Sequence, residues 1–300
     1  MKNIIVVTGG AGFIGSNLIE LLIKKTKHKI ISIDNYSTGS VRNHLVNRKV
    51  KYIKGETKNI EKILARKKNN IKTIFHFGEF SRIYQSFKLI DKCYYSNMIG
   101  TYEIIKFCSK YKIRIIYSAS SSKLGNKGKD ENLSPYSWSK SKNIEFIENF
   151  NSWFGLRYEI LYFYNVYGPK QIKNSNMSAV IGIFESLYEK NLPLTVVKPG
   201  TQKRDFTHVD DIINGSYLAY KKGKNDHYFL GTKKNNTVLS IAKLYKTKIK
   251  MIPSRPGERL GSIIKNNKAY NDLGYEAKIN IRKYIKNYIS KFKKWICKIS

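Results

Sequence analysis

The sequence contains few cysteines and no long apolar run, and each shortage excludes a class of protein. Its three cysteines, Cys93, Cys108 and Cys297, lie far apart and form no CxxC or Cys/His spacing. This pattern argues against a disulfide framework and against a metal site. No stretch approaches the roughly 20 apolar residues that cross a bilayer, and the first apolar run is too short for a signal peptide. We therefore expect a soluble, unprocessed, metal-free protein in a reducing cytoplasm.

Acidic residues are also scarce, since 21 Asp and Glu accompany 56 Lys and Arg, for a formal net charge of +35. Such a charge on its own suggests a nucleic-acid or acidic-membrane partner. The lysines are nevertheless spread along the chain together with abundant Ile and Asn, whereas a nucleic-acid footprint should cluster. We interpret the charge as a general lysine bias that gives a solvated basic surface, and we expect no nucleic-acid partner.

The beginning of the 300-residue chain has the pattern of a strand, a tight turn and a helix. An apolar run from Ile4 to Val7 precedes a glycine-rich turn, and apolar residues at helical spacing follow it. The turn carries Gly9, Gly12 and Gly15, whose missing side chains let backbone N–H groups approach a pyrophosphate. The next predicted strand, 29–34, ends at Asp34, where a carboxylate accepts hydrogen bonds from ribose hydroxyls and repels a 2′-phosphate. These features predict an NAD site.

Strands and helices alternate through the first half of the chain. We predict strands at 50–54, 72–77 and 113–119, and helices at 60–68 and 97–110. Apolar strands that alternate with helices indicate a parallel sheet with both faces covered. We therefore predict an α/β fold with a Rossmann-type doubly wound sheet formed by 1–165 and about 206–235. A smaller C-terminal substrate domain would comprise about 166–205 and 236–300.

The later part of the chain has a less regular pattern. It predicts a helix at 178–190 and a strand at 194–197. Apolar residues recur at helical spacing in the basic tail, and we expect this stripe to pack on its own domain rather than on an anionic membrane. The stripe consists of Ile281, Ile285, Tyr288, Phe292, Trp295 and Ile296.

The segment SPYSWSK, residues 134–140, places Tyr136 and Lys140 one turn apart on a helix that begins after Ser134. The ammonium group of such a lysine can stabilise a tyrosinate. Ser120, at the end of the preceding strand, can donate a hydrogen bond to the same substrate oxygen, and ligands bind at strand ends of such sheets. Four other pairs share the spacing without this context, and we interpret them as half-buried tyrosines beside exposed lysines: Tyr84/Lys88, Tyr102/Lys106, Tyr217/Lys221 and Tyr220/Lys224.

Motifs spread over nearly the whole chain resemble those of one protein family. They are TGGAGFIGS, IDNYSTGS, HFGEFSR, NMIGT, SASSSKLG, SPYSWSK, YFYNVYGP, GTQKRDFTHVDD, RPGE and DLGYEAK. Together they resemble the extended short-chain dehydrogenases/reductases, and within them the NAD-dependent nucleotide-sugar epimerases and dehydratases, with UDP-glucose 4-epimerases as the nearest type. The resemblance implies a cytoplasmic enzyme of carbohydrate metabolism, a nucleotide-sugar substrate and a homodimer.

The resemblance also assigns roles to individual residues. It implies that catalysis depends on Ser120, Tyr136 and Lys140. The residues implied to bind NAD are Gly9, Gly12, Phe13, Ile14, Gly15, Asp34, Asn35, Ser37, Thr38, Gly39, Glu56, Thr57, Phe77, Gly78, Ser81, Asn97, Tyr136, Lys140 and Tyr164. Those implied to bind the nucleotide-sugar are Ser120, Asn165, Arg204, Arg255 and Glu258. Two guanidinium groups from separate loops can clamp a diphosphate.

The residues after Ser120 discriminate between reactions within this family. In 4,6-dehydratases an acidic residue follows the matching position, whereas Ser121, Ser122 and Lys123 follow here. We therefore expect a 4-epimerase acting on a UDP-hexose or a UDP-N-acetylhexosamine, in which a tyrosinate takes the C4 hydroxyl proton while NAD takes and returns the hydride. Surface polysaccharide biosynthesis is the pathway that the family's usual products suggest.

Two alternatives stay open. A dehydratase or C4 dehydrogenase is one, because Glu79 and Arg82 in HFGEFSR depart from the family pattern near the sugar pocket and could supply acid/base chemistry. The other is a catalytically silent member that binds RNA or a protein partner through its basic surface. The intact set of Ser120, Tyr136 and Lys140 disfavours this second alternative.

Overall fold

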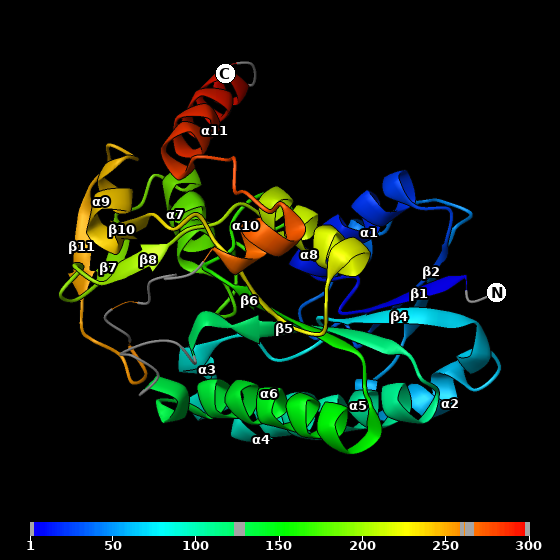
Figure 1. Cartoon of the computed structure of the whole chain (residues 1–300). Helices are drawn as coiled ribbons and strands as arrows, with labels where there is room; N and C mark the ends of the chain where they lie inside the picture. The colour runs from blue at the N-terminus through cyan, green and yellow to red at the C-terminus, as the bar shows by residue number, and fades with distance from the viewer. Residues whose placement is uncertain (1–2, 123–129, 259–260, 262–266, 298–300) are drawn as a thin grey trace.

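A parallel sheet of seven strands, in the order β3-β2-β1-β4-β5-β6-β9, forms the centre of the computed structural model (Figure 1). The structure describes residues 3–122, 130–258, 261 and 267–297. Every neighbouring pair in this sheet is parallel. The strands are β1 (Ile4–Thr8), β2 (Lys29–Asp34), β3 (Val50–Lys54), β4 (Ile71–His76), β5 (Arg114–Ser120), β6 (Tyr158–Phe163) and β9 (His227–Leu230). The predicted doubly wound sheet is confirmed.

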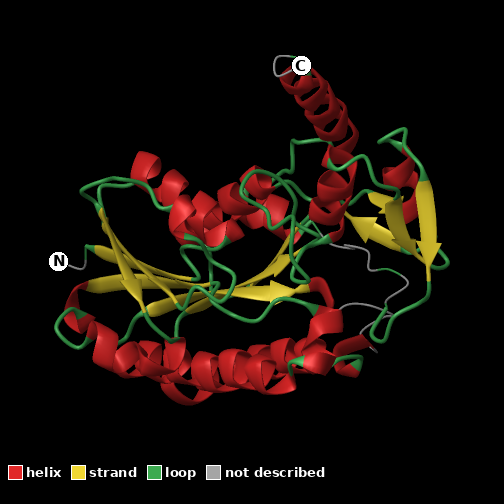
Figure 2. Cartoon of the chain, turned by 180° about the vertical axis from the view of Figure 1, so that it is seen from behind, coloured by secondary structure: helices red, strands yellow, loops and turns green. Residues whose placement is uncertain are grey.

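Helices cover both faces of the sheet (Figure 2). One face carries α1 (Phe13–Lys25), α8 (Val209–Lys222) and α10 (Lys268–Leu273). The other carries α2 (Ile60–Leu64), α5 (Gly100–Lys110) and α6 (Pro135–Phe154), with α3 (Ile83–Lys88) and α4 (Ile90–Tyr94) packed on α6. A wide turn of π-helical geometry at Tyr95–Ile99 joins α4 to α5. Short 3₁₀ turns lie at Val41–Asn43, Thr57–Asn59 and Lys68–Asn70.

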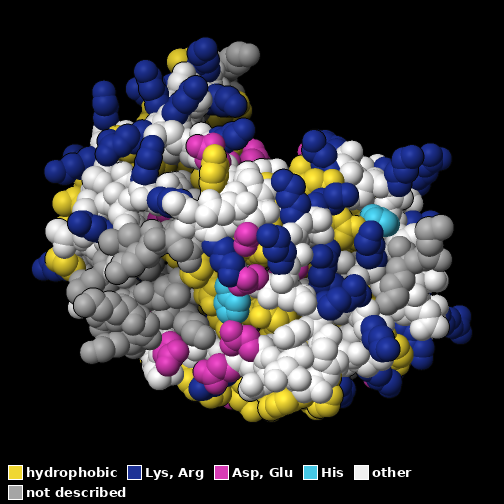
Figure 3. Space-filling view, in the orientation of Figure 1, with side chains coloured by type: hydrophobic (Ala, Val, Ile, Leu, Met, Phe, Trp, Pro, Cys, Tyr) yellow, Lys and Arg dark blue, Asp and Glu magenta, His cyan; other side chains and the backbone are white. Residues whose placement is uncertain are grey.

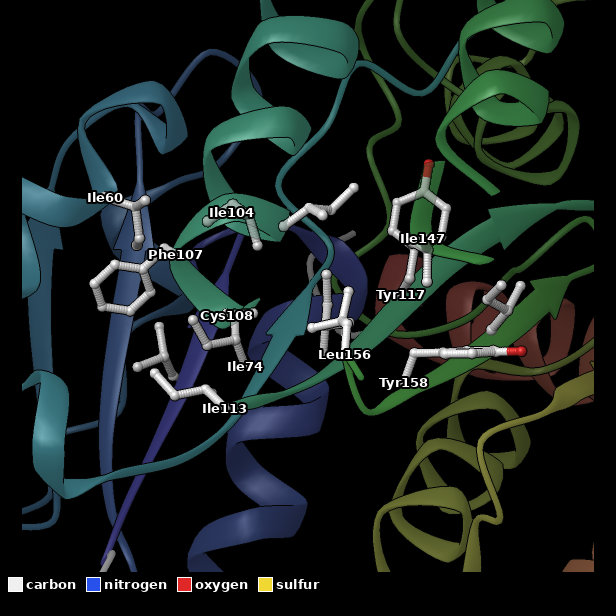
Figure 4. Close-up of a cluster of buried hydrophobic side chains, with 14 of the residues drawn as sticks. Ile60, Ile74, Ile104, Phe107, Cys108, Ile113, Tyr117, Ile147, Leu156 and Tyr158 are labelled. Atoms are coloured by element: carbon white, nitrogen blue, oxygen red, sulfur yellow. The ribbon is translucent and has the colours of Figure 1, made fainter. Parts of the chain in front are cut away.

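The core explains why the strands are so apolar. All five residues of β1 are buried, as expected of a strand covered on both faces. On the α5 and α6 side, Ile74 and Tyr117 from the sheet pack with Ile104 and Ile147 from the helices (Figure 4). Burying a side chain of this size stabilises the fold by about 1.5–3 kcal/mol. Packing against helices therefore holds the strand ends in register, where the cleft described below opens.

A separate hydrophobic cluster organises the rest of the chain. Its members include Phe184, Ile241 and Ile285. It holds together α7 (Val180–Glu189), β7 (Leu194–Val197), α9 (Val238–Lys243), β11 (Ile249–Ile252) and α11 (Ile281–Ile296), and β8 (Lys203–Asp205) and β10 (Asn235–Thr237) adjoin it in the chain. Strand β7 pairs with β11 in parallel, and β8 pairs with β10 antiparallel. This cluster supports the proposed substrate domain, whose boundaries stay a prediction.

Several element boundaries differ from the prediction. Helix α2 ends at Leu64 rather than at residue 68, because the chain must return to the sheet at Ile71, whose side chain is fully buried. The helix predicted at 97–110 begins instead as the π-helical turn, and α5 proper begins at Gly100. No helix in the described ranges is long and apolar enough to span a bilayer.

The apolar stripe of α11 is only partly buried. Ile281 and Ile285 pack into the hydrophobic cluster that contains Phe184 and Ile241, as expected. The end of the helix projects from the molecule (Figure 1), and Trp295 and Ile296 are exposed. The expectation that the whole stripe packs on its own domain is therefore wrong for the last turn.

Candidate active site

A cleft of about 720 Å³ opens at the carboxyl ends of the central strands and extends to the second cluster. It lies beside the point where the strand order reverses between β1 and β4, which is where such sheets bind ligands. The predicted site residues that line it are Gly9, Gly12, Phe13, Ile14, Gly15, Asp34, Asn35, Ser37, Thr38, Glu56, Thr57, Phe77, Gly78, Ser81, Ser120, Tyr136, Lys140, Asn165, Arg204, Arg255 and Glu258. Segments far apart in the sequence thus meet in one cleft.

Three of the predicted site residues, Gly39, Asn97 and Tyr164, are not among the lining residues. The Asn97 side chain is fully buried, donates to the Phe80 carbonyl over 3.1 Å and accepts from the Phe80 N–H over 2.7 Å. It therefore braces the loop after β4 rather than facing the cleft. Gly39 packs beside Asp34, and the Tyr164 ring is fully buried.

The turn between β1 and α1 is shaped to receive an anion. Gly9 has a φ of +69°, and a Cβ on Gly15 would lie 2.1 Å from the Gly9 carbonyl oxygen. Side chains are thus excluded at both positions, and the backbone can approach a ligand closely. Gly12 precedes α1 without a side-chain cap, so the first N–H groups of the helix remain available to a pyrophosphate. The turn fits NAD.

Asp34 ends β2 and lines the cleft beside the glycine turn. Its carboxylate accepts from the N–H of Ala11 over 2.9 Å and from that of Tyr36 over 2.8 Å. Burial raises the pKa of Asp34, and the two N–H donors oppose that rise. Each carboxylate oxygen has a second lone pair, which can accept from a ribose hydroxyl. Beside it, Asn35 Nδ2 donates to Glu56 over 3.2 Å and holds that carboxylate at the cleft.

Helix α6 holds Tyr136 and Lys140 at the centre of the cleft. Ser134 caps the helix by accepting from the Ser137 N–H over 3.0 Å, and Pro135 occupies its first turn. The Ser86 hydroxyl of α3 accepts from the Tyr136 N–H over 3.2 Å. These contacts fix the first turn of α6, so that Tyr136 and Lys140 lie on its cleft face one turn apart. The predicted cap and helix are confirmed.

Lys140 is buried and ion-paired with Glu79. Glu79 lies in the loop that follows β4 and is one of the residues of HFGEFSR that depart from the family pattern. The side chains of Lys140 and Glu79 are 4% and 1% exposed, and the ammonium donates both to Glu79 Oε2 and to the Ser118 carbonyl. The other oxygen, Oε1, accepts from Thr101 over 2.9 Å and from Tyr117 and Asn143 over 3.1 Å each. Both oxygens of Glu79 are therefore engaged.

A hydrogen-bonded chain runs from β1 to Glu79. The Thr8 hydroxyl accepts from the two backbone N–H groups that follow His76, so its own proton points to His76 Nδ1 over 2.8 Å. The proton of His76 must then lie on Nε2, which donates to the Thr101 hydroxyl over 2.9 Å. Thr101 in turn donates to Glu79. The chain holds Glu79 beneath Lys140.

The buried His76 in this series of hydrogen bonds makes the free energy of unfolding depend on pH. Burial lowers the pKa of His76 from 6.5 to about 4, so between these pH values the folded protein binds fewer protons than the unfolded chain. Its contribution to the free energy of unfolding is present above pH 6.5 and is lost as the pH falls toward 4. Since one pKa unit corresponds to about 1.4 kcal/mol, lowering the pH from 7.5 to 5 should cost roughly 2 kcal/mol.

His76→Gln should lose roughly 2 kcal/mol less than the unsubstituted protein over this interval, because glutamine keeps hydrogen-bonding groups but does not titrate. Urea unfolding of both proteins at pH 7.5 and pH 5 measures the difference. Burial also lowers the pKa of His28 and His208, and both residues are present in the variant, so their effects cancel. Equal losses in the two proteins would contradict the assignment.

Arginines gather at the outer end of the cleft. Arg204 donates to Glu258 over 2.7 Å, which ties the RPGE loop to β8. Burial lowers the pKa of Arg204, and Glu258 opposes that effect. The guanidinium of Arg255 lies 5.3 Å from the ring centre of Tyr84. The sequence predicts Tyr84 to be a half-buried tyrosine beside an exposed lysine. In the structure it also lines the cleft and packs against Arg255.

Sequence reasoning missed several lining residues. Besides Tyr84, they include Gln85 on α3, Asn176 before α7, Thr195 on β7 and Gln202 before β8. Gln85, Asn176 and Thr195 lie outside every motif, so only the spatial arrangement identifies them, whereas the position of Gln202 in GTQKRDFTHVDD could have singled it out. Lys123, the third residue after Ser120, lies outside the described residues.

The strand order and the glycine turn define a dinucleotide-binding protein of the Rossmann type, and the Tyr136/Lys140 pair beside the cleft is that of a short-chain dehydrogenase/reductase. The chain belongs to the NAD dependent epimerase/dehydratase family, whose sequence profile matches residues 5–231. Members of this family are NAD-dependent enzymes, so this chain is an enzyme that uses NAD as its cofactor.

Similar proteins include epimerases of UDP-sugars. The chain is 29% identical to a putative UDP-glucose 4-epimerase of Methanocaldococcus jannaschii, over 95% of this chain and 97% of that protein. A UDP-glucose 4-epimerase from Thermotoga maritima, solved with UDP-glucose, superimposes with a TM-score of 0.88 at 27% identity and covers 98% of this chain and 99% of its own. A UDP-glucuronic acid 4-epimerase from Bacillus cereus, solved with UDP-glucuronic acid and NAD, has a TM-score of 0.86 at 25% identity, covering 97% and 99%.

Proposed function

We propose that this protein is a nucleotide-sugar 4-epimerase that acts on a UDP-hexose or a UDP-N-acetylhexosamine. The observation that carries the proposal is that Tyr136 and Lys140 share a cleft in which every described carboxylate has a hydrogen-bond or ion-pair partner. Among the described lining residues, Asp34 accepts from the glycine turn at Ala11, Glu56 accepts from Asn35, Glu79 pairs with Lys140, and Glu258 pairs with Arg204. Similarity to UDP-sugar 4-epimerases supports the same reaction.

In this proposal Tyr136 is the general base and acid. Its phenolate takes the proton of the sugar C4 hydroxyl as the C4–H bond breaks, so that a 4-keto sugar forms. When bound, NAD supplies the acceptor and donor of the hydride. Ser120, at the end of β5, donates a hydrogen bond to the C4 oxygen, and Lys140 binds the nicotinamide ribose. After the keto sugar turns over, Tyr136 returns the proton, and no atom is lost.

A 4,6-dehydratase is the second candidate, because the family includes dehydratases. Elimination of water needs an acid and a base near C5 and C6. Ser121 and Ser122, which follow β5, carry no carboxylate, and both oxygens of Glu79 are engaged by four donors. We therefore favour the epimerase.

A substrate panel tests the proposed reaction. The NAD-loaded protein is incubated with UDP-glucose, UDP-N-acetylglucosamine and their GDP and dTDP counterparts, and the products are followed by chromatography with mass detection. We expect a UDP-sugar product of unchanged mass and altered retention. Loss of one water would identify a dehydratase, and no product from any sugar would favour a silent binding protein.

We further propose a homodimer that buries the α4–α6 face. Exposed aromatic residues occur there, including Tyr95 at 60% and Phe154 at 63% exposure. Light scattering should give twice the mass of one chain, and a monomer would contradict this.

Basic residues are scattered over the face seen in Figure 3, with several around α11. This distribution supports a solvated surface over a single nucleic-acid footprint.

A further inference from the structure

The positive charges that line the cleft are balanced unequally. Lys140 pairs with Glu79, and Arg204 pairs with Glu258. Arg82, just before α3, has no carboxylate partner among the described residues. Its Nε donates to the Met177 carbonyl, and its Nη1 donates to its neighbour's carbonyl over 2.8 Å. A half-buried cation whose partners are neutral carbonyls keeps its full charge, and burial disfavours such a charge unless an anion forms nearby.

Arg82 directly precedes α3, which packs on α6, the helix that begins with Pro135 and Tyr136. The Ser86 hydroxyl donates to the Ile83 carbonyl over 2.6 Å and accepts from the Tyr136 N–H, so it joins the first turns of the two helices. Both Arg82 and Tyr136 line the cleft. Burial lowers the pKa of Arg82, and attraction to the Tyr136 side chain opposes that effect. The phenol of Tyr136 is therefore a group in the same cleft that can become an anion and attract Arg82.

The charge of Lys140 is largely cancelled by the buried carboxylate of Glu79. An ammonium paired at contact distance presents a dipole rather than a net charge to a third group. The Thr101, Tyr117 and Asn143 side chains donate hydrogen bonds to the other oxygen of Glu79 and fix its position. The usual stabilisation of a tyrosinate by the lysine of the pair is accordingly weakened in this chain.

We propose that Arg82 supplies the net positive charge that stabilises deprotonated Tyr136, and that Glu79 fixes Lys140 while cancelling most of its charge. The proposal rests on the role of Tyr136 in the proposed function. Arg82 and Glu79 act through Tyr136 and Lys140, and both are therefore positioning residues. No covalent change involves either side chain.

Other titratable groups also surround this site and stay unchanged in the test. They are His76 at the end of β4, Cys93 on α4, Tyr117 on β5, Tyr84 on α3, and Arg255 of the loop that contacts Tyr84. Burial raises the pKa of Cys93 to about 11 and lowers that of His76 to about 4. Neither group therefore changes charge between about pH 5 and pH 10.

The test is a direct titration of Tyr136 in the NAD-loaded protein. Tyrosinate formation is followed by ultraviolet absorbance, and the curve of Tyr136→Phe is subtracted so that the other tyrosines cancel. Arg82→Gln should raise the midpoint by about 1 pH unit, and Glu79→Gln should lower it by about 1 pH unit. Arg82→Lys should restore a midpoint close to that of the unsubstituted protein. Where a substrate is turned over, the acid limb of kcat/KM should shift in the same directions.

Lys88→Gln is the matched control, because it removes one positive charge from the exposed side of the same helix. Its midpoint should stay unchanged. An unchanged midpoint in Arg82→Gln would overturn the role of Arg82, and a raised KM with it would make Arg82 a substrate-binding residue. An unchanged midpoint in folded Glu79→Gln would overturn the role of Glu79. The titration needs no turnover, so failure of the proposed reaction is distinguished from failure of this inference.

Discussion

Tyr136→Phe is expected to lower kcat about 10³-fold while the protein keeps its NAD and its thermal stability. A positioned general base contributes typically about 10²- to 10⁴-fold, and phenylalanine preserves the ring but removes the group that takes the C4 proton. The backbone N–H of residue 136 still donates to Ser86, so the first turn of α6 should be unchanged. Initial rates with the identified UDP-sugar, with bound NAD measured after denaturation, provide the comparison.

Tyr102→Phe is the matched control. Tyr102 also has a lysine four residues later, and the Lys106 ammonium lies 5.2 Å from the centre of its ring. It is 38% exposed on α5, away from the cleft lining, and its substitution should leave kcat within about twofold. Equal activities of the Tyr136 and Tyr102 variants would show that the pair on α6 has no special role.

Gly15→Ala is expected to abolish retention of NAD during purification. A Cβ at this position would lie 2.1 Å from the Gly9 carbonyl oxygen, and the obstacle is backbone rather than a flexible side chain. The turn must therefore move, which costs roughly 1–3 kcal/mol by the usual scale of overpacking. Because each 1.4 kcal/mol is about tenfold in affinity, NAD should bind about 5- to 150-fold more weakly. Isothermal titration of NAD-stripped protein measures this.

Gly155→Asn is the control that separates an effect on the glycine turn from a general loss of stability. Gly155 ends α6 in a left-handed conformation, with no atom within 4 Å of its Cβ direction. Asparagine adopts that conformation with little strain, so NAD affinity should stay unchanged. If Gly15→Ala bound NAD as tightly as Gly155→Asn, the glycine turn would not be the pyrophosphate site.

Local patterns in the sequence were sufficient to predict the nucleotide-binding half. The runs at Ile4–Thr8 and Lys29–Asp34 are continuous, glycines punctuate them, and both strands are found where periodicity places them. The α6 start was equally readable, because Ser134 and Pro135 have cap and first-turn preferences that depend on neighbouring residues only. Such features need no knowledge of distant contacts.

The arrangement of charges in the cleft could not be predicted in this way. Glu79 and Lys140 are 61 residues apart, and their pairing depends on how β4 and α6 meet. The hypothesis of Glu79 as a free acid/base group followed from its departure from a motif, whereas the structure gives it an ion pair. Asn97 shows the same limit, since its motif predicts cofactor contact and its hydrogen bonds brace Phe80.

The proposed reaction requires that the sugar is oxidised at C4 and receives the same hydride back. A UDP-sugar carrying deuterium at C4, incubated with the NAD-loaded protein in ordinary water, tests it most directly. The product should be a C4 epimer of unchanged mass with the deuterium still at C4, as located by nuclear magnetic resonance. Loss of the deuterium to solvent, or its transfer to C6 with loss of water, would contradict it.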